Sequence, residues 1–217
     1  MIDVVLHLCK INIMKRLLLS QGRTGSLNLT RYVRESNLDT IVYREPFNTT
    51  AIRDTGIEHQ FKKIISNPNI FVENKIGNDS FPIELQHLNT DELITLLKSK
   101  FDIIGILMRR DIDSQTESLA NARKSDNWNS KYVYQPIDTN SINKYKSLLE
   151  NEKNTFTYIS ETYNIPIFYY EDLYIENQNK NMMGFCEYFN IKYDEIIMQK
   201  HMNIDKKYRI NETKKIL

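Results

Sequence analysis

The sequence predicts an α/β fold of three layers, in which a central, mostly parallel sheet of about five strands lies between layers of helices. Several short apolar runs lack an alternation of polar and apolar residues, which is typical of strands covered on both faces. Stretches with apolar residues at helical spacing separate these runs. Strands and helices that alternate in this way favour a parallel sheet with helices on both faces. The 217 residues suit one domain and are few for two.

Five segments are expected to form the buried strands of this sheet. In chain order they are Arg16–Gln21, Thr40–Arg44, Ile70–Ile76, Asp102–Arg110 and Ile165–Tyr170. Five stretches are expected to be helical, and the clearest of them contains the sequence DELITLLKSKF. They are Gly25–Glu35, Asn89–Lys100, Ser114–Lys124, Asn140–Tyr163 and Asn181–Phe189. The polar segment Ile175–Asn181 is expected to be a surface loop.

The composition bears on which partners the protein has. Hydrophobic residues make up 41% of the chain and charged residues 26%, as in an ordinary globular domain. The formal net charge of +1 does not indicate binding to nucleic acid or to an anionic membrane surface. No run approaches the roughly 20 apolar residues that a membrane span needs. We therefore expect neither nucleic acid nor a membrane span, and any bound anion must be held by a local cluster of cations.

The cysteines and the first residues bear on location and domain limits. Cys9 and Cys186 cannot form a disulfide framework and lack metal-ligand spacing, so we expect reduced thiols in a cytoplasmic protein. Cys186 is expected in the core, on a late helix. The opening segment is too short and too polar for a signal peptide. Residues 1–13 are expected to be a loosely attached extension of a single domain, residues 14–217.

The segment QGRTGS, residues 21–26, is the most informative in the chain. It follows an apolar strand and opens a helix, so several backbone N–H groups and the helix dipole are directed at one point, as in phosphate sites. Gly22 and Gly25 allow a ligand to approach the backbone, and Thr24 and Ser26 offer hydroxyl groups. The alternative is a plain strand–turn–helix connection.

This loop differs from the phosphate loop of ATP-binding proteins. No lysine follows Gly25, so the pattern G-x-x-x-x-G-K-[ST] is absent. A cation, Arg23, lies inside the loop instead. An anion bound here would therefore be neutralised by a guanidinium.

A second cluster follows the fourth expected strand. Arg110 lies at the carboxyl end of that strand, where open α/β sheets bind ligands, and Ser118 follows eight residues later on the next helix. Helical side chains lean toward the N-terminus, so Ser118 could face the same anion as Arg110. Strand alternation directs Arg109 to the opposite face. The alternatives are an ion pair between Arg110 and either Asp111 or Asp113, and a capping box of Ser114 and Glu117 that serves the helix alone.

The two motifs together resemble those of sulfotransferases that use 3′-phosphoadenosine 5′-phosphosulfate (PAPS). Arg23-Thr24-Gly25-Ser26 is similar to the family's 5′-phosphosulfate loop, and Arg110 with Ser118 is similar to its 3′-phosphate site. Two further segments, Glu45-Pro46-Phe47 and Tyr170-Glu171-Asp172-Leu173, support the resemblance. It runs from about Arg16 to Phe189 and is closest to the bacterial branch that sulfates carbohydrates and lipid-linked sugars.

The resemblance implies a P-loop-like fold and direct in-line transfer of a sulfuryl group from PAPS, without a metal, to release adenosine 3′,5′-bisphosphate. The acceptor is expected to be the hydroxyl of a carbohydrate or small molecule. Arg23 is expected to stabilise the leaving phosphate oxygen, and Glu45 to take the acceptor proton. Glu171 and Asp172 are interpreted as structural. The residues expected to bind the donor are Gly22, Arg23, Thr24, Gly25, Ser26, Leu27, Arg110 and Ser118.

The chain departs from the family pattern at three places, and two other functions stay open. Lys75-Ile76-Gly77 stands where many members have a histidine base, Gly22 stands where many have proline or another residue, and Leu27 replaces a common hydroxyl residue. One alternative is a P-loop kinase-like phosphotransferase that uses ATP. The other is a protein that binds a nucleotide without turnover. The acceptor pocket is expected between Asn140–Tyr163 and Asn78–Leu88, and Trp128 and Lys124 are expected to line either this pocket or the adenine pocket.

Overall fold

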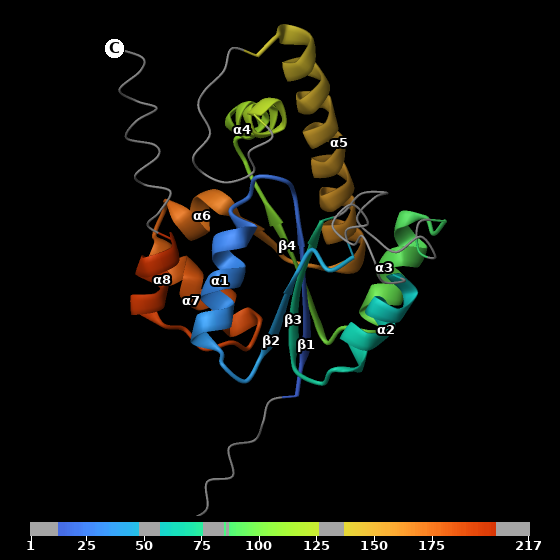
Figure 1. Ribbon diagram of the computed structural model, residues 1–217, viewed down its shortest axis with the longest axis vertical. Helices are drawn as coiled ribbons and strands as arrows, with labels where there is room; N and C mark the ends of the chain where they lie inside the picture. The colour runs from blue at the N-terminus through green and yellow to red at the C-terminus, as the bar shows by residue number, and fades with distance from the viewer. Residues whose placement is uncertain (1–12, 48–56, 76–84, 86, 126–136, 203–217) are drawn as a thin grey trace, which may run out of the picture.

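A computed structural model of the chain describes residues 13–47, 57–75, 85, 87–125 and 137–202. A five-stranded parallel sheet in the order β2-β3-β1-β4-β5 forms its centre (Figure 1). All carboxyl ends therefore meet at one edge. The strands are β1 (Lys15–Ser20), β2 (Ile41–Arg44), β3 (Ile70–Lys75), β4 (Ile103–Met108) and β5 (Ile167–Tyr169).

Helices cover both faces of the sheet and complete the three layers, which confirms the predicted α/β class. One face packs against α1 (Ser26–Ser36), α6 (Tyr170–Tyr174), α7 (Gln178–Tyr188) and α8 (Glu195–Met202). The other face packs against α2 (Ile57–Ser66), α3 (Thr90–Lys98) and α5 (Thr139–Tyr163). The helix α4 (Ile112–Ser125) lies beyond the carboxyl edge, against α5 (Figure 1).

The central strand β1 contributes to both hydrophobic cores. Leu17 and Leu19 point to the core under α3 and α5, and Leu18 points to the core under α1 and α7. All three side chains are fully buried. Removal of this apolar surface from water is the main source of stability in such a layered fold. Burial on both faces also explains why the run has no polar alternation.

A buried arginine joins the amino end of β1 to two distant segments. The Arg16 Nε donates to the carbonyl of Phe189 at 2.5 Å, and its Nη2 donates to the carbonyl of Asn190 at 2.9 Å. Its Nη1 donates to Asn69 Oδ1 at 2.8 Å. A buried charge is tolerated only where its donors are satisfied, as they are here. Arg16 therefore ties the start of β1 to the end of α7 and to the residue before β3.

The five predicted strands are all present, each within two residues of the expected bounds. The helices α2, α6 and α8 were not predicted. The helix α7 begins at Gln178 and so includes the second half of the segment expected to be a loop, Ile175–Asn181. Cys186 is buried on α7, as expected, whereas Cys9 lies outside the described residues.

The predicted extension, residues 1–13, lies outside the described part of the chain except for Ile13, whose side chain is exposed. Across the described ranges, no helix is long and apolar enough to cross a membrane.

Gly105→Ala should destabilise the fold, because a Cβ at this position in β4 would lie 2.7 Å from Cζ of the buried ring of Phe189. We expect a loss of about 1–3 kcal/mol in the free energy of unfolding, the usual cost of overpacking. The control is Gly184→Ala on α7, where no described atom lies within 4 Å of the added Cβ. This change should raise stability by roughly 0.5–1 kcal/mol through helix propensity. Urea denaturation measures both, and equal effects would contradict the packing argument.

Candidate functional site

The candidate site lies at the carboxyl edge of the sheet, around the β1–α1 loop (residues 21–25). Because β1 lies between β3 and β4, this edge has a topological switch point, where open α/β sheets bind ligands. The helix α1 starts at Ser26, and no described side chain caps its N-terminus. Its first N–H groups and its dipole therefore favour an anion at the loop.

Two residues in left-handed conformation shape the loop. Arg23 has φ 63° and Gly25 has φ 74°. A Cβ at Gly25 would lie 2.8 Å from Cζ of Tyr174, whose hydroxyl donates to the Gly25 carbonyl at 2.5 Å. A glycine is therefore required at position 25, because the backbone is left-handed there and Tyr174 of α6 leaves no room for a Cβ. Gly22 has no positive φ, and no described atom lies within 4 Å of an added Cβ, so it borders open space.

The other predicted loop residues have distinct environments. Thr24 is fully buried, and its hydroxyl donates to the Gln21 carbonyl at 2.9 Å, so it stabilises the turn from inside. The Ser26 hydroxyl accepts a hydrogen bond from Lys75 Nζ at 3.2 Å. Leu27 lines a pocket between α1 and β2. The Thr24 hydroxyl is thus directed at the backbone of the loop, whereas the Ser26 hydroxyl, at the start of α1, is directed at the ammonium group of Lys75.

The structure brings Arg23 together with Ser118. The Arg23 Nε donates to Ser118 Oγ at 2.9 Å, which joins the β1–α1 loop to α4. Asp111 rather than Ser114 caps α4, because its Oδ1 accepts the N–H of Ser114 at 2.9 Å. The alternative that Ser114 caps the helix in a box with Glu117 is therefore wrong, and Ser118 lies on the second turn of a helix that starts at Ile112.

Arg110 points to a different partner. Its Nη1 and Nη2 donate to the two carboxylate oxygens of Asp172 at 2.6 and 2.7 Å, and its guanidinium lies 4.1 Å from the centre of the Tyr169 ring. The hydrogen bonds that Arg110 donates to Asp172 raise the pKa of Arg110 above its ordinary value. Arg110 makes no direct contact with Ser118 in the structure. The alternative interpretation of Arg110 as one half of an ion pair is correct, but the expected partners Asp111 and Asp113 were wrong, because the partner is Asp172 on α6.

The adjacent Arg109 has the opposite environment, as strand alternation predicted. It is buried, donates from Nη2 to Ser114 Oγ at 2.8 Å, and lies against the Tyr170 ring. Glu171 accepts the backbone N–H of Arg110 at 3.0 Å, in keeping with its predicted structural role. The two arginines therefore reach the carboxyl edge on different sides of β4.

A lysine from the neighbouring strand completes the cation set of the loop. Lys75 Nζ lies 2.9 Å from Ser20 Oγ, at the end of β1, as well as 3.2 Å from Ser26 Oγ. It also lies 2.9 Å from Glu73 Oε1 and 3.5 Å from Glu45 Oε1. Sequence reasoning did not assign Lys75 to the site. The signals for it were its place at the carboxyl end of a strand and the match of Lys75-Ile76-Gly77 to the family segment that holds the histidine base.

Glu73 holds this lysine from inside the fold. Its side chain is fully buried, and Oε1 accepts from Lys75 and from the Ser20 hydroxyl. Burial alone would raise the pKa of Glu73. The Lys75 ammonium and the hydrogen bond from the Ser20 hydroxyl lower it by more than burial raises it, so the pKa lies below its usual range. Glu73 is therefore an anion that orients Lys75 toward the β1–α1 loop.

Glu45 is placed on the other side of Lys75. It follows β2 in a left-handed conformation with φ 46°, and its N–H donates to the Glu73 carbonyl at 2.6 Å. About a quarter of its side chain is exposed. The predicted base thus lies at the sheet edge, beside a cation and open to solvent.

A second carboxylate, Glu152, was missed by sequence reasoning. It lies on α5, one turn after Leu149, whose carbonyl accepts from Gln21 Nε2 of the β1–α1 loop at 3.2 Å. Its Oε2 is buried and has no hydrogen-bond partner in the described chain. Burial raises the pKa of Glu152 to about 7, although the charge of Lys75 lowers it in part. Helical periodicity could not identify it, because the surface that α5 meets depends on the fold.

Other predicted residues contribute less. Trp128 lies outside the described residues, as does most of the segment Asn78–Leu88. Lys124 is exposed at the end of α4.

Within the described chain, no group of three or more His, Cys, Asp or Glu side chains is arranged to hold a metal ion. No known protein-family model and no curated protein matches the chain.

Glu152→Gln should change how stability depends on pH. The folded protein binds the Glu152 proton more tightly than the unfolded chain does. The contribution of Glu152 to the free energy of unfolding therefore falls as the pH rises from 4.5 through 7. A pKa raised from 4.5 to about 7 corresponds to roughly 3 kcal/mol at full deprotonation, at about 1.4 kcal/mol per unit. Glutamine removes this cost, so the variant should gain about that much over wild type between pH 4.5 and 8.

Urea denaturation at each pH measures the difference. Glu150→Gln, an exposed change on the same helix, is the control and should stay within about 0.5 kcal/mol of wild type. A difference between Glu152→Gln and wild type that does not vary with pH would contradict the buried-carboxyl argument.

Proposed function

We propose that the protein is a sulfotransferase that moves a sulfuryl group from PAPS to the hydroxyl of a carbohydrate or small-molecule acceptor. The observation that carries this proposal is the pair of cations, Arg23 and Lys75, around the uncapped N-terminus of α1. A phosphosulfate is a compact anion of the kind that such a helix start binds. The resemblance of residues 23–26 to a phosphosulfate loop adds independent support.

The proposed reaction is a single in-line displacement. A bond forms between the acceptor oxygen and sulfur, and the bond between sulfur and the 5′-phosphate oxygen breaks. The electron pair stays on the phosphate, which leaves as adenosine 3′,5′-bisphosphate. Charge that develops on this oxygen would be stabilised by Arg23, by Lys75 and by the first N–H groups of α1. All of these groups are held in place before any ligand binds.

The acceptor proton needs a base, and Glu45 and Glu152 are the two candidates, because Glu73 is fully buried and held by Lys75. Glu45 is the base expected from the sequence, and its Oε1 lies 3.5 Å from Lys75 Nζ. Glu152 is the second candidate, because a pKa near 7 suits a group that takes a proton at neutral pH. In this proposal Glu45 accepts the proton, and Glu152 acts if the acceptor approaches from the side of α5.

The 3′-phosphate of the donor is assigned to Arg110 and Ser118. Arg110 uses Nη1 and Nη2 on Asp172, so a phosphate would have to compete with this carboxylate. Arg23 donates a hydrogen bond to Ser118, which supports a donor whose 5′-phosphosulfate and 3′-phosphate bind close together. Binding of the donor therefore requires the Arg110–Asp172 pair to rearrange.

One observation favours a second function, an ATP-dependent phosphotransferase. Lys75 brings an ammonium group to the β1–α1 loop, as the loop lysine of ATP-binding proteins does. The two functions differ in the ligand that the site prefers. A phosphotransferase prefers ATP, and a sulfotransferase prefers a nucleotide with a 3′-phosphate.

Arg110→Ala should weaken binding of adenosine 3′,5′-bisphosphate by at least about tenfold and leave 5′-AMP binding nearly unchanged, because only the former has the 3′-phosphate. Calorimetric titration of wild type and variant with both nucleotides, and of wild type with ATP, measures this. Lys180→Gln, which removes an exposed positive charge on α7, is the control. An equal loss for both nucleotides would remove Arg110 from the 3′-phosphate site. Tighter binding of ATP by wild type would favour the phosphotransferase.

Arg23→Ala should lower the rate of sulfuryl transfer by about 10²–10³-fold, because the developing charge loses one donor, while nucleotide binding falls much less. Arg23→Gly should lose as much activity without backbone strain, because glycine suits the φ of 63°. Transfer of ³⁵S from labelled PAPS to a panel of sugars measures both variants. A rate close to wild type in Arg23→Gly would show that the guanidinium has no part in the reaction.

A further inference from the structure

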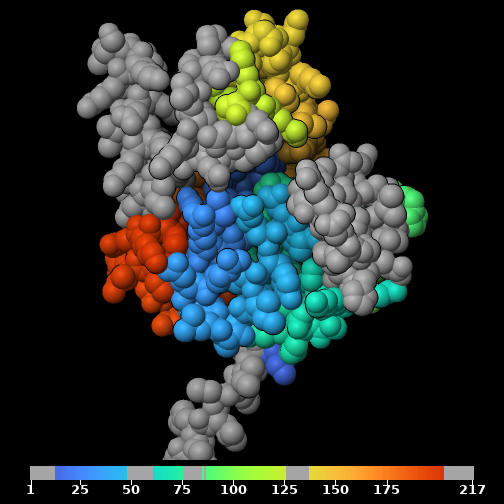
Figure 2. All heavy atoms as spheres, viewed as in Figure 1, coloured from blue at the N-terminus to red at the C-terminus, as the bar shows by residue number. Residues whose placement is uncertain are grey.

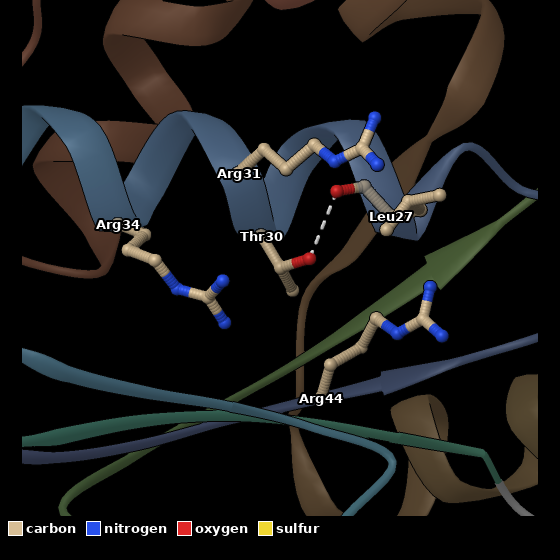
Figure 3. Close-up of a pocket in the computed structure, with 5 residues that line it drawn as sticks. All are labelled: Leu27, Thr30, Arg31, Arg34 and Arg44. Carbon is tan, nitrogen blue, oxygen red and sulfur yellow. Dashed lines mark hydrogen bonds between the residues drawn. The ribbon is translucent and has the colours of Figure 1, made fainter.

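A pocket of about 330 Å³ lies between α1 and β2, and three arginines line it (Figure 3). Arg31 and Arg34 come from α1, and Arg44 comes from the end of β2. Arg34 and Arg44 extend into the gap from opposite sides (Figure 3). Residues of α1 and β2 lie next to each other on the face that Figure 2 shows, in two shades of blue.

The charge of this arginine pocket is not balanced within the described chain. None of Arg31, Arg34 and Arg44 forms an ion pair with a described carboxylate, and all three are exposed. The polar contact of Arg34 is a long hydrogen bond from Nη2 to the Val42 carbonyl, at 3.4 Å. Like charges that line one pocket repel each other, so a bound anion would relieve that repulsion. The pocket is thus suited to a ligand that carries negative charge.

The pocket is next to the proposed base Glu45, on the face of the sheet that α1 covers, whereas the sequence led us to expect the acceptor beside α5 on the other face. Leu27, on one wall, directly follows Ser26, which contacts Lys75. Arg44, on the other wall, directly precedes Glu45, the proposed base. Of the residues assigned to the 3′-phosphate, Ser118 is on α4 and Arg110 follows β4, so both are on the opposite side of β1. A ligand that extends from Glu45 into the arginine pocket would therefore be the acceptor and not the donor.

We propose that the arginine pocket binds an anionic group of the acceptor, so that the substrate is an acidic sugar with a carboxylate, phosphate or sulfate group. This inference rests on the proposed function, because it assigns the substrate class of the same site. A planar guanidinium can hold such a group by two hydrogen bonds, and two arginines on facing walls can hold it from both sides. The anionic group positions the sugar, and a hydroxyl on the same sugar reaches the phosphosulfate.

The test measures binding of four matched probes: glucose, glucuronate, glucose 6-phosphate and glucose 6-sulfate. Each is titrated by ligand-observed NMR into the full chain with saturating adenosine 3′,5′-bisphosphate, so that the donor site is filled. Wild type should bind at least one anionic probe about tenfold or more tightly than glucose. The three anions distinguish which acidic group the pocket prefers.

The double variant Arg34→Gln/Arg44→Gln should lose this preference and keep its affinity for the bisphosphate. Lys180→Gln, with one exposed charge removed from α7, should keep both. Binding of glucose and the anionic probes with equal affinity by wild type would overturn the inference, as would displacement of the probes by the bisphosphate. Failure of wild type to bind the bisphosphate while the probes still bind would instead overturn the proposed sulfotransferase function, and the acceptor role with it.

Discussion

The buried contact between Glu73 and Lys75 is the interaction on which the site depends. This contact joins the carboxyl ends of β3 and β1, because Glu73 accepts hydrogen bonds both from Lys75 on β3 and from Ser20 at the end of β1. A buried carboxylate is costly unless it is paired, so the fold keeps Lys75 where it is. The ammonium is thereby fixed between Ser26 and Glu45. A group needed for catalysis gains from such positioning, since little reorganisation is left for the reaction.

A second constraint brings the C-terminal third of the chain to the same place. The turn at Gly25 leaves room for Tyr174, and the Tyr174 hydroxyl satisfies the Gly25 carbonyl. The helix α6 that holds Tyr174 also provides Asp172, the partner of Arg110. The conformation of the β1–α1 loop and the orientation of Arg110 are therefore set by one short helix. An anion that draws Arg110 away from Asp172 would act on the helix that supports the loop.

The fold class was predictable from local patterns, whereas the partners within the site were not. Leu17, Leu18 and Leu19 are apolar in succession because β1 is covered on both faces, and this information is local. The role of Lys75 depends on β3 lying beside β1, and strand order is not encoded in any short segment. The spacing of Arg110 and Ser118 predicted a common anion, but Asp172, sixty-two residues after Arg110 in the chain, takes its guanidinium. Ser118 turns to Arg23 instead.

The cations of the protein are concentrated locally, although the chain carries a net charge of only +1. On one side of β1, Arg110 and Arg109 each face a carboxylate of α6, so their charge is largely balanced before a ligand arrives. On the other side, Arg31, Arg34 and Arg44 have no such partner in the described chain. An anion on the first side must compete with Asp172 for Arg110, whereas an anion in the arginine pocket competes with no described carboxylate. The two sides of β1 therefore differ in whether an ion pair must break before an anion can bind.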